Sequence, residues 1–163
     1  MVMIEGILPK IIQLYDKCGV SFTEFNKQKE SIEYDACTFK LNGKSVICRT
    51  AKITPTKIGQ FVTVWKRSEN GITIPFNIND NFDFFVITTL NGKLFGQFIF
   101  PKSVLLAKGV ISGENSAGKR GIRVYPPWDL TTSKQAQKTQ HWQLAYFVNF
   151  DDDYPALIKK LLK

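Results

Sequence analysis

The fold of this chain is decided by residues 83–100, DFFVITTLNGKLFGQFIF. Two apolar runs flank Asn91-Gly92, a dipeptide that is the strongest short-range signal for a β-hairpin with a two-residue turn. With these two residues in the turn, paired positions sum to 183, so we expect Phe85 opposite Phe98. Both faces of both strands are apolar, which is typical of strands in the middle of a sheet that is covered on both sides.

The segments on either side of this hairpin supply the other elements that such a sheet needs. Apolar residues recur at helical spacing over residues 4–17. A second Asn-Gly turn, at 42–43, predicts a hairpin in which Cys37 lies opposite Cys48. The other expected strands are 32–41, 44–53, 58–66, 121–125 and 143–150, and the other expected helices are 101–108, 132–142 and 154–163. This order predicts an α/β fold with a mixed central β-sheet flanked by helices, in a single domain that spans residues 1–163.

Composition indicates a basic globular protein. Lys and Arg number 22 against 14 Asp and Glu, a formal net charge of +8, which favours a polyanionic partner such as nucleic acid. Polar residues or glycines interrupt every apolar run before it reaches the roughly 18 residues of a membrane-spanning helix, and the N-terminal segment lacks the features of a secretory signal. The three cysteines match no zinc spacing. We therefore expect a cytoplasmic protein with reduced, buried thiols and no membrane contact.

The positive charge is concentrated in two windows of the sequence. Residues 44–67 contain six basic residues and no acidic one, and residues 101–123 contain five basic residues and one acidic one. The windows thus carry +6 and +4, while the rest of the chain carries −2. Clustered charge of this kind is the electrostatic footprint of phosphate binding, and a solvated surface with incidental clustering is the alternative interpretation.

Residues 112–129, SGENSAGKRGIRVYPPWD, combine glycines, basic residues and aromatic rings. Backbone N–H groups beside fixed positive charge suit phosphate oxygens, and flat aromatic side chains can stack on an exposed base. The segment that follows, 132–142, is rich in Gln and Lys, and its Trp142 is expected to pack against the sheet. The candidate nucleic-acid-binding residues are Lys44, Arg49, Lys52, Thr54, Lys57, Lys66, Arg67, Lys119, Arg120, Arg123, Trp128, Lys134, Gln137, Lys138 and Gln140.

Two enzymatic interpretations meet obstacles. Residues 113–119 match the first seven positions of a P-loop, but Arg120 stands where a hydroxyl should hold magnesium. The order of elements resembles the restriction-endonuclease-like core of the PD-(D/E)XK type, whose metal site needs a carboxylate on one strand and a (D/E)-x-K triplet on its neighbour. The candidates here are Asp83 on the first strand and residues 97–99 on the second, where Gln97 replaces the acid and Ile99 the lysine. Asp83 is expected opposite Phe100, which places Gln97 on the other face of the hairpin. We assign no catalytic residue, no metal ligand and no cofactor.

Five segments together are similar to the MepB-like family of small bacterial proteins. They are AKITPTKIGQFVTVWKR (51–67), DFFVI (83–87), FGQFIFPKSVLL (95–106), GKRGIRVYPPWD (118–129) and QAQKTQHWQLAYF (135–147). The resemblance implies a bacterial cytoplasmic protein with an endonuclease-like fold that binds nucleic acid rather than a transporter. The family supplies no established catalytic residues, so the candidate residues rest on their chemistry and on their positions in these segments.

The sequence therefore favours a protein that binds nucleic acid, DNA in the first instance, without catalysis. It would contact phosphates through the basic hairpin and the Gly/Lys/Arg-rich loop. Two alternatives stay open. One is a divergent metal-dependent nuclease of the PD-(D/E)XK type, and the other is an accessory factor whose basic surface binds an acidic protein or a small molecule. The sequence indicates no oligomeric state.

Overall fold

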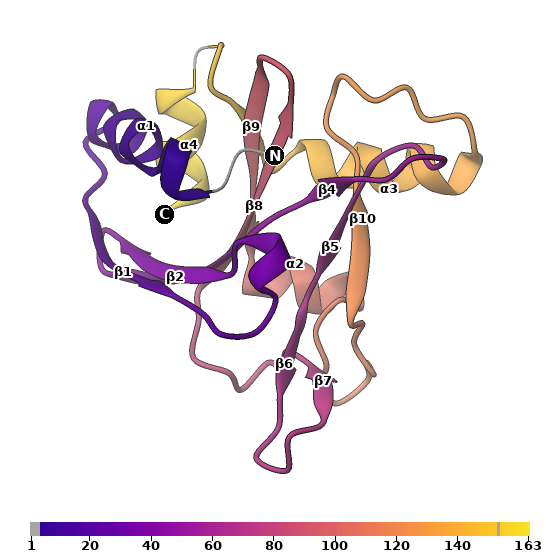
Figure 1. Cartoon of the computed structure of the whole chain (residues 1–163). Helices are drawn as coiled ribbons and strands as arrows, with labels where there is room; N and C mark the ends of the chain where they lie inside the picture. Colours follow the sequence, from indigo (N-terminus) through magenta and orange to yellow (C-terminus); the bar gives the residue numbers. More distant parts are fainter. Residues whose placement is uncertain (1–3, 153) are drawn as a thin grey trace.

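The structure, a computed structural model, describes residues 4–152 and 154–163. Its largest element is a six-stranded sheet (Figure 1). In spatial order the strands are β1 (Phe22–Lys27), β2 (Cys37–Leu41), β3 (Lys44–Thr50), β8 (Phe84–Asn91), β9 (Leu94–Pro101) and β11 (Phe147–Asn149). β3 and β8 run parallel and the other neighbouring strands antiparallel, so the sheet is mixed, as predicted.

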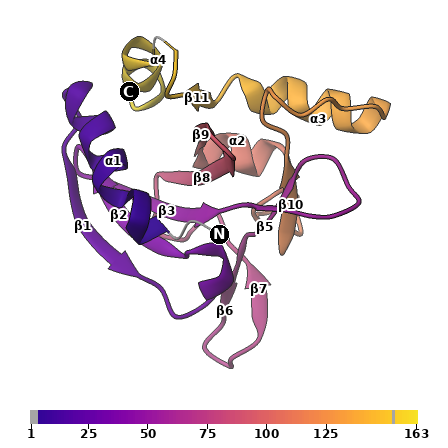
Figure 2. The same cartoon turned by 45° about the horizontal axis from the view of Figure 1, so that its top comes forward.

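Helices and a smaller sheet cover the two faces of this sheet (Figures 1 and 2). On one face lie α1 (Ile4–Lys17) and α4 (Pro155–Leu161). The other face carries α2 (Lys102–Ala107), α3 (Lys134–Leu144) and a three-stranded sheet of β10 (Gly121–Val124), β5 (Gln60–Thr63) and β4 (Lys52–Ile53). A ribbon of β6 (Trp65–Arg67) and β7 (Thr73–Pro75) follows β5, and the 3-10 turn η1 (Ile32–Tyr34) precedes β2. The predicted α/β fold with a mixed central sheet flanked by helices is confirmed.

Side chains of β8 and β9 alternate between two hydrophobic clusters. Phe84, Val86 and Ile99 belong to the cluster under α1 and α4. Phe85 and Phe98 belong to the cluster under the smaller sheet, α2 and α3. All five side chains are at most 5% exposed, and burying one large apolar side chain contributes roughly 1.5–3 kcal/mol. The expectation that both faces of this hairpin are covered is confirmed.

The register between β8 and β9 differs from the prediction by two residues. Phe85 lies opposite Phe100 rather than Phe98. The turn consists of Gly92-Lys93 with Gly92 at φ +61°, as in the type II′ turn, which places Gly at the first central position. A shift of two residues keeps every side chain on its own face of the sheet. The hydrophobic pattern therefore gave no preference between the two turns.

The first hairpin has the predicted register. Asn42 and Gly43 have φ angles of 51° and 79°, which fits the two positive φ angles of a type I′ turn. Cys37 lies opposite Cys48, and both thiols are buried and free, as is that of Cys18. The burial of all three cysteines expected from the sequence is thus confirmed.

Several predicted boundaries were wrong. The expected strand 32–41 begins only at Cys37, because residues 32–34 form η1. The expected strand 58–66 is divided between β5 and β6, and the expected strand 143–150 shrinks to Phe147–Asn149 because α3 continues to Leu144. In the described part of the chain, no helix has the length and apolar character needed to cross a membrane.

A buried polar network joins α1 to the middle of the sheet. The hydroxyl of Tyr15 donates to Oε1 of Gln97 at 2.6 Å, and Nε2 of Gln97 donates to Oγ1 of Thr88 at 2.9 Å. All three side chains are fully buried. Because water does not reach them, each polar group depends on its partner, and an unpaired one costs more than a neutral hydrogen bond contributes.

Replacing Tyr15 with Phe is expected to lower the free energy of unfolding by about 1–3 kcal/mol, because Oε1 of Gln97 then loses its donor in a buried site. Urea unfolding followed by circular dichroism measures this change. Tyr154→Phe removes a hydroxyl from the partly exposed start of α4 and is the matched control, with an expected change within about 0.5 kcal/mol. Equal losses in the two variants would contradict a stabilising role for the Tyr15–Gln97 bond.

Candidate functional site

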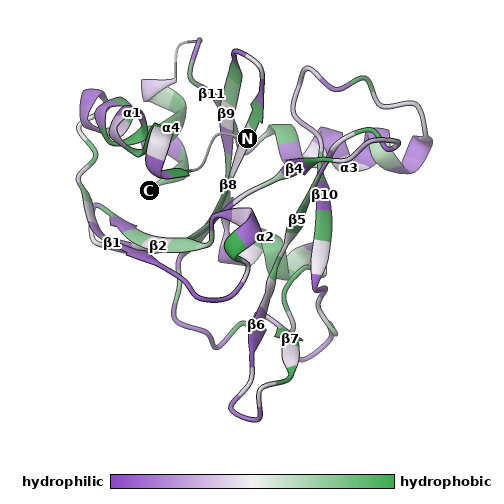
Figure 3. Cartoon of the chain, in the orientation of Figure 1, coloured by the Kyte–Doolittle hydropathy of each residue, from purple (hydrophilic) through white to green (hydrophobic). Residues whose placement is uncertain are grey.

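Two adjoining cavities follow α3 on the side that faces β10. The larger, of about 380 Å³, lies between α3, β10 and the residues after α2. The smaller, of about 320 Å³, lies between the start of α3 and the loop that joins β4 to β5. Both are lined by Arg123, Tyr125, Ser133 and Ala136. We call the two cavities together the α3 groove; Figure 3 shows α3 itself as largely hydrophilic.

Gln143 of α3 holds the end of β10 in place. Its Oε1 accepts a hydrogen bond from the backbone N–H of Tyr125 at 2.9 Å, and its Nε2 donates to the carbonyl of Arg123 at 3.0 Å. Gln143 is 1% exposed. β10 in turn pairs with β5, where Arg123 lies opposite Phe61. The floor of the groove is therefore fixed by backbone and amide hydrogen bonds rather than by charged groups.

Gln140 shapes the loop between β10 and α3. Its Nε2 donates to the carbonyls of Pro126 and Asp129, both at 2.9 Å, and its Oε1 accepts from the hydroxyl of Thr131 at 2.9 Å. Gln137 assists through a 3.3 Å bond to the carbonyl of Thr131. Gln140, a candidate for nucleic-acid contact, therefore uses its amide within the loop in this structure.

Arg123 connects β10 to the loop between β4 and β5. Its guanidinium donates to Oγ1 of Thr54 at 2.7 Å and to the carbonyls of Ile58 and Gly59, both at 3.3 Å. Gly59 has φ +86°, and a Cβ there would lie 2.6 Å from the ring of Tyr125. Glycine thus lets the ring lie against this loop. Thr54 and Arg123, both predicted site residues, meet at the groove, where Thr54 positions the guanidinium.

Basic residues from both sequence windows reach the α3 groove. Lys57, from the first window, lines the smaller cavity. Lys108 and Lys119, from the second, line the larger one, and Arg123 lines both. Lys134 and Lys138 are exposed on α3. Three candidate residues, Lys57, Lys119 and Arg123, therefore line the α3 groove.

Arg49 is buried away from any ligand, whereas Trp128 is half-buried. Arg49 is 2% exposed, donates to the carbonyl of Cys48 at 2.9 Å and lies 5.7 Å from the ring centre of Phe85. Burial lowers the pKa of its guanidinium. Trp128 packs edge-on against Phe147 at 5.7 Å, and its indole nitrogen is buried. The assignment of Arg49 to nucleic-acid contact is wrong because its side chain is buried. Trp128 keeps part of its surface exposed and stays a candidate.

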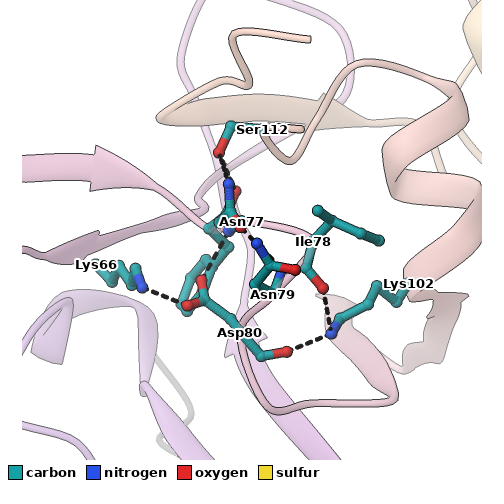
Figure 4. Close-up of polar contacts among 8 residues, drawn as sticks. Lys66, Asn77, Ile78, Asn79, Asp80, Lys102 and Ser112 are labelled. Carbon is teal, nitrogen blue, oxygen red and sulfur yellow. Dashed lines mark hydrogen bonds and ion pairs between the residues drawn. The ribbon is translucent and has the colours of Figure 1, made fainter. Parts of the chain in front are cut away.

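Lys66 of β6 contacts the loop that precedes β8 (Figure 4). Its ammonium forms an ion pair with Asp80, whose other carboxylate oxygen accepts from the N–H of Asn77 at 2.7 Å. Lys102 donates to the carbonyl of Ile78 at 2.9 Å and to that of Asp80. These two cations stabilise the loop instead of adding free charge to the α3 groove.

The other predicted cations are dispersed. Lys44 donates to the carbonyl of Leu162 at 2.7 Å, at the end of α4. Lys52 lies 4.7 Å from the ring centre of Tyr34, and Arg67 lies 5.3 Å from that of Trp65. The exposed Arg120 donates to the carbonyl of Thr73 at 3.1 Å. None of these four residues lines the α3 groove.

Lys108 and Gln143 line the groove but were not among the candidates from the sequence. Lys108 lies 5.4 Å from the ring centre of Trp142, and both line the larger cavity. Trp142 also packs against Phe100 at 5.5 Å, so the expected packing against the sheet is confirmed for one part of its surface. The sequence feature that could have identified Lys108 is its position in the second basic window, 101–123. Nothing in the sequence distinguished Gln143 from the other glutamines of the helix.

The carboxylate pair needed by a PD-(D/E)XK site is not formed at the β8–β9 hairpin. Asp83 is exposed, and its Oδ2 accepts from the N–H of Ser45 at 2.8 Å. Gln97 is buried against Tyr15 on the opposite face of the sheet. The predicted separation of these two residues is confirmed even though the predicted register was not.

Fold and groove together define a basic α/β protein whose second layer carries a cation-lined groove. The MepB-like family matches residues 28–149 of the chain. A crystal structure of MepB is 34% identical, with a TM-score of 0.80, over 89% of this chain and 98% of that one. This chain belongs to the MepB-like family, as its sequence segments indicated.

Two further comparisons add less. A bacterial homing endonuclease, I-Ssp6803I, is 18% identical with a TM-score of 0.47, over 83% of this chain and 85% of that one. A likeness this low carries no argument about this chain. No curated protein sequence matches it.

Replacing Gln143 with Leu is expected to lower the free energy of unfolding by about 1–3 kcal/mol, because the partly buried N–H of Tyr125 and carbonyl of Arg123 lose their partner. Hydrogen exchange should show faster exchange at the Tyr125 amide. Gln135→Leu, on the exposed side of the same helix, is the control and should change neither quantity appreciably. An unchanged Tyr125 exchange rate in Gln143→Leu would contradict the role assigned to Gln143.

Proposed function

We propose that this protein binds DNA along the α3 groove without cleaving it. The observation that carries the proposal is that Lys57, Lys108, Lys119 and Arg123, drawn from both basic windows of the sequence, line two cavities that adjoin each other. Clustered cations attract the phosphate backbone and release its counterions. Lys134 and Lys138 are further exposed cations of α3, although they line neither cavity.

The polar contacts of the groove support this proposal. Arg123 uses its contacts with Thr54, Ile58 and Gly59 to hold its guanidinium in place, and a guanidinium has five N–H donors, enough to contact a phosphate as well. Lys57 is exposed and lines the smaller cavity, and Lys119 is exposed and lines the larger one. Contacts of this kind fix a protein on the DNA backbone and carry no sequence information.

The proposal of binding without cleavage rests on the β8–β9 hairpin. A metal-dependent nuclease of the PD-(D/E)XK type needs carboxylates that share one ion, whereas Asp83 and Gln97 lie on opposite faces here. Incubation of plasmid DNA with the protein and Mg²⁺ or Mn²⁺ tests this part of the proposal. Cleavage that Asp83→Ala abolishes would establish the nuclease alternative instead.

The double variant Lys57→Ala/Lys119→Ala is expected to weaken binding to duplex DNA and to reduce the slope of log affinity against log salt by about 2, since each lost phosphate contact reduces it by about 1. Fluorescence anisotropy with a labelled duplex between 50 and 200 mM salt, the range over which phosphate contacts dominate, measures both.

Lys29→Ala is the control for the loss of positive charge. Lys29 is exposed in the segment between β1 and η1 and lines neither cavity, so the salt slope should stay at its wild-type value. Equal slopes in the groove variant and the wild type would exclude the α3 groove as the phosphate-binding surface. Failure of the wild-type protein to retard duplex or single-stranded DNA at low salt would instead favour an acidic protein or a small molecule as the partner.

A further inference from the structure

The larger cavity of the α3 groove combines two kinds of chemistry that a smooth phosphate-binding surface would not need. Its cations, Lys108, Lys119 and Arg123, suit an anionic group, and its two aromatic side chains, Tyr125 and Trp142, suit a planar ring. Its volume of about 380 Å³ is at the lower end of the range for small-molecule sites. A ligand with both a planar ring and a phosphate matches this lining.

The aromatic side chains are fixed before any ligand arrives. Trp142 packs against Phe100 at 5.5 Å on the sheet side and has the ammonium of Lys108 5.4 Å from its ring centre. The ring of Tyr125 lies against Gly59, and its backbone N–H is held by Gln143. Rings that are already ordered cost little entropy on binding. Both remain partly exposed and line the cavity.

The cations stand where a phosphate attached to that ring could reach them. Lys57 lines the smaller cavity, Arg123 lines both, and Lys119 and Lys108 line the larger one. A DNA strand that passes from the smaller cavity to the larger one would therefore meet cations along its whole path. Arg123 is held by three acceptors of the loop between β4 and β5. Its guanidinium is therefore oriented before a ligand binds, and an oriented guanidinium can bind a phosphate with a specific geometry.

From these observations we propose that the larger cavity holds a single unpaired nucleotide, with its base beside Tyr125 and Trp142 and its phosphate among Lys108, Lys119 and Arg123. This inference rests on the proposed DNA binding and deepens it, because it names the feature of the DNA that the groove selects. A base can enter such a cavity only if it is free of its pairing partner, which a bulge or a single strand provides at least cost.

The test compares three DNA ligands that carry the same fluorescent label: a fully paired duplex, the same duplex with one bulged thymine, and a single strand. Thymidine 5′-monophosphate provides a fourth arm that separates a free nucleotide from one in a strand. The wild-type protein is expected to bind the bulged duplex about 5- to 100-fold more tightly than the paired one, the factor that base–aromatic stacking supplies. Permanganate oxidation of the bulged thymine should fall on binding, because the cavity covers its ring.

Ala136→Phe is the blocking variant, because Ala136 lines both cavities and the substitution removes no charge. It should abolish the preference for the bulged duplex and the protection from permanganate. His141→Phe places the same ring on an exposed position of α3 that lines neither cavity, and should leave both unchanged. Circular dichroism confirms that both variants are folded.

The outcomes separate the inference from the proposed function. Equal binding of paired and bulged duplex by the wild-type protein would overturn the inference and leave DNA binding intact. Tighter binding of thymidine 5′-monophosphate than of the bulged duplex would also overturn it, in favour of a free nucleotide. If no DNA binds but the monophosphate binds and Ala136→Phe abolishes this, the cavity is a nucleotide site and the proposed DNA binding fails. If neither ligand binds, both fail.

Discussion

The need to bury both faces of β8 and β9 organises the whole structure. Their side chains enter two separate hydrophobic clusters, so a single layer of helices could not cover them. The two ends of the chain supply α1 and α4 for one face, and the segments around β4, β5, β10 and α3 supply a second layer for the other. The α3 groove therefore lies on a layer whose position is set by apolar burial, and its polar residues only refine that position.

The second layer also divides the basic residues by role. Where it covers the central sheet, Arg49 is buried over Phe85. Where its loops meet the start of β8, Lys66 and Lys102 hold Asp80 and its neighbours. Cations remain exposed mainly at the edges of the layer, as with Lys57 and Lys119. The net charge of +8 is therefore larger than the charge that a ligand can reach, because some of the cations are buried or make contacts within the fold.

The sequence predicted what depends on local pattern and missed what depends on contacts between distant segments. The two-residue period of a β-strand assigned each residue of 83–100 to a face, but it could not choose between Asn91-Gly92 and Gly92-Lys93 as the turn, because a shift of two residues leaves the faces unchanged. Arg49 was a candidate for nucleic-acid contact because the second layer that buries it has no local signature in the sequence. Gln140 and Gln143 act on a loop whose path only the folded chain reveals.

Gln97 is separated from the α3 groove by the central sheet, so a catalytic group at this position could not act on DNA bound there. Gln97 is fully buried under α1, bonded to Tyr15 and Thr88, whereas the groove belongs to the layer on the opposite face of the sheet. A carboxylate at position 97 would meet the same buried surroundings, and ionising it there would cost several kcal/mol. Because the side chain of Gln97 points from β9 toward α1, the central sheet would separate Gln97 from a DNA strand bound along α3. The proposed binding therefore needs nothing from this position, and the amide there is explained by the packing of α1.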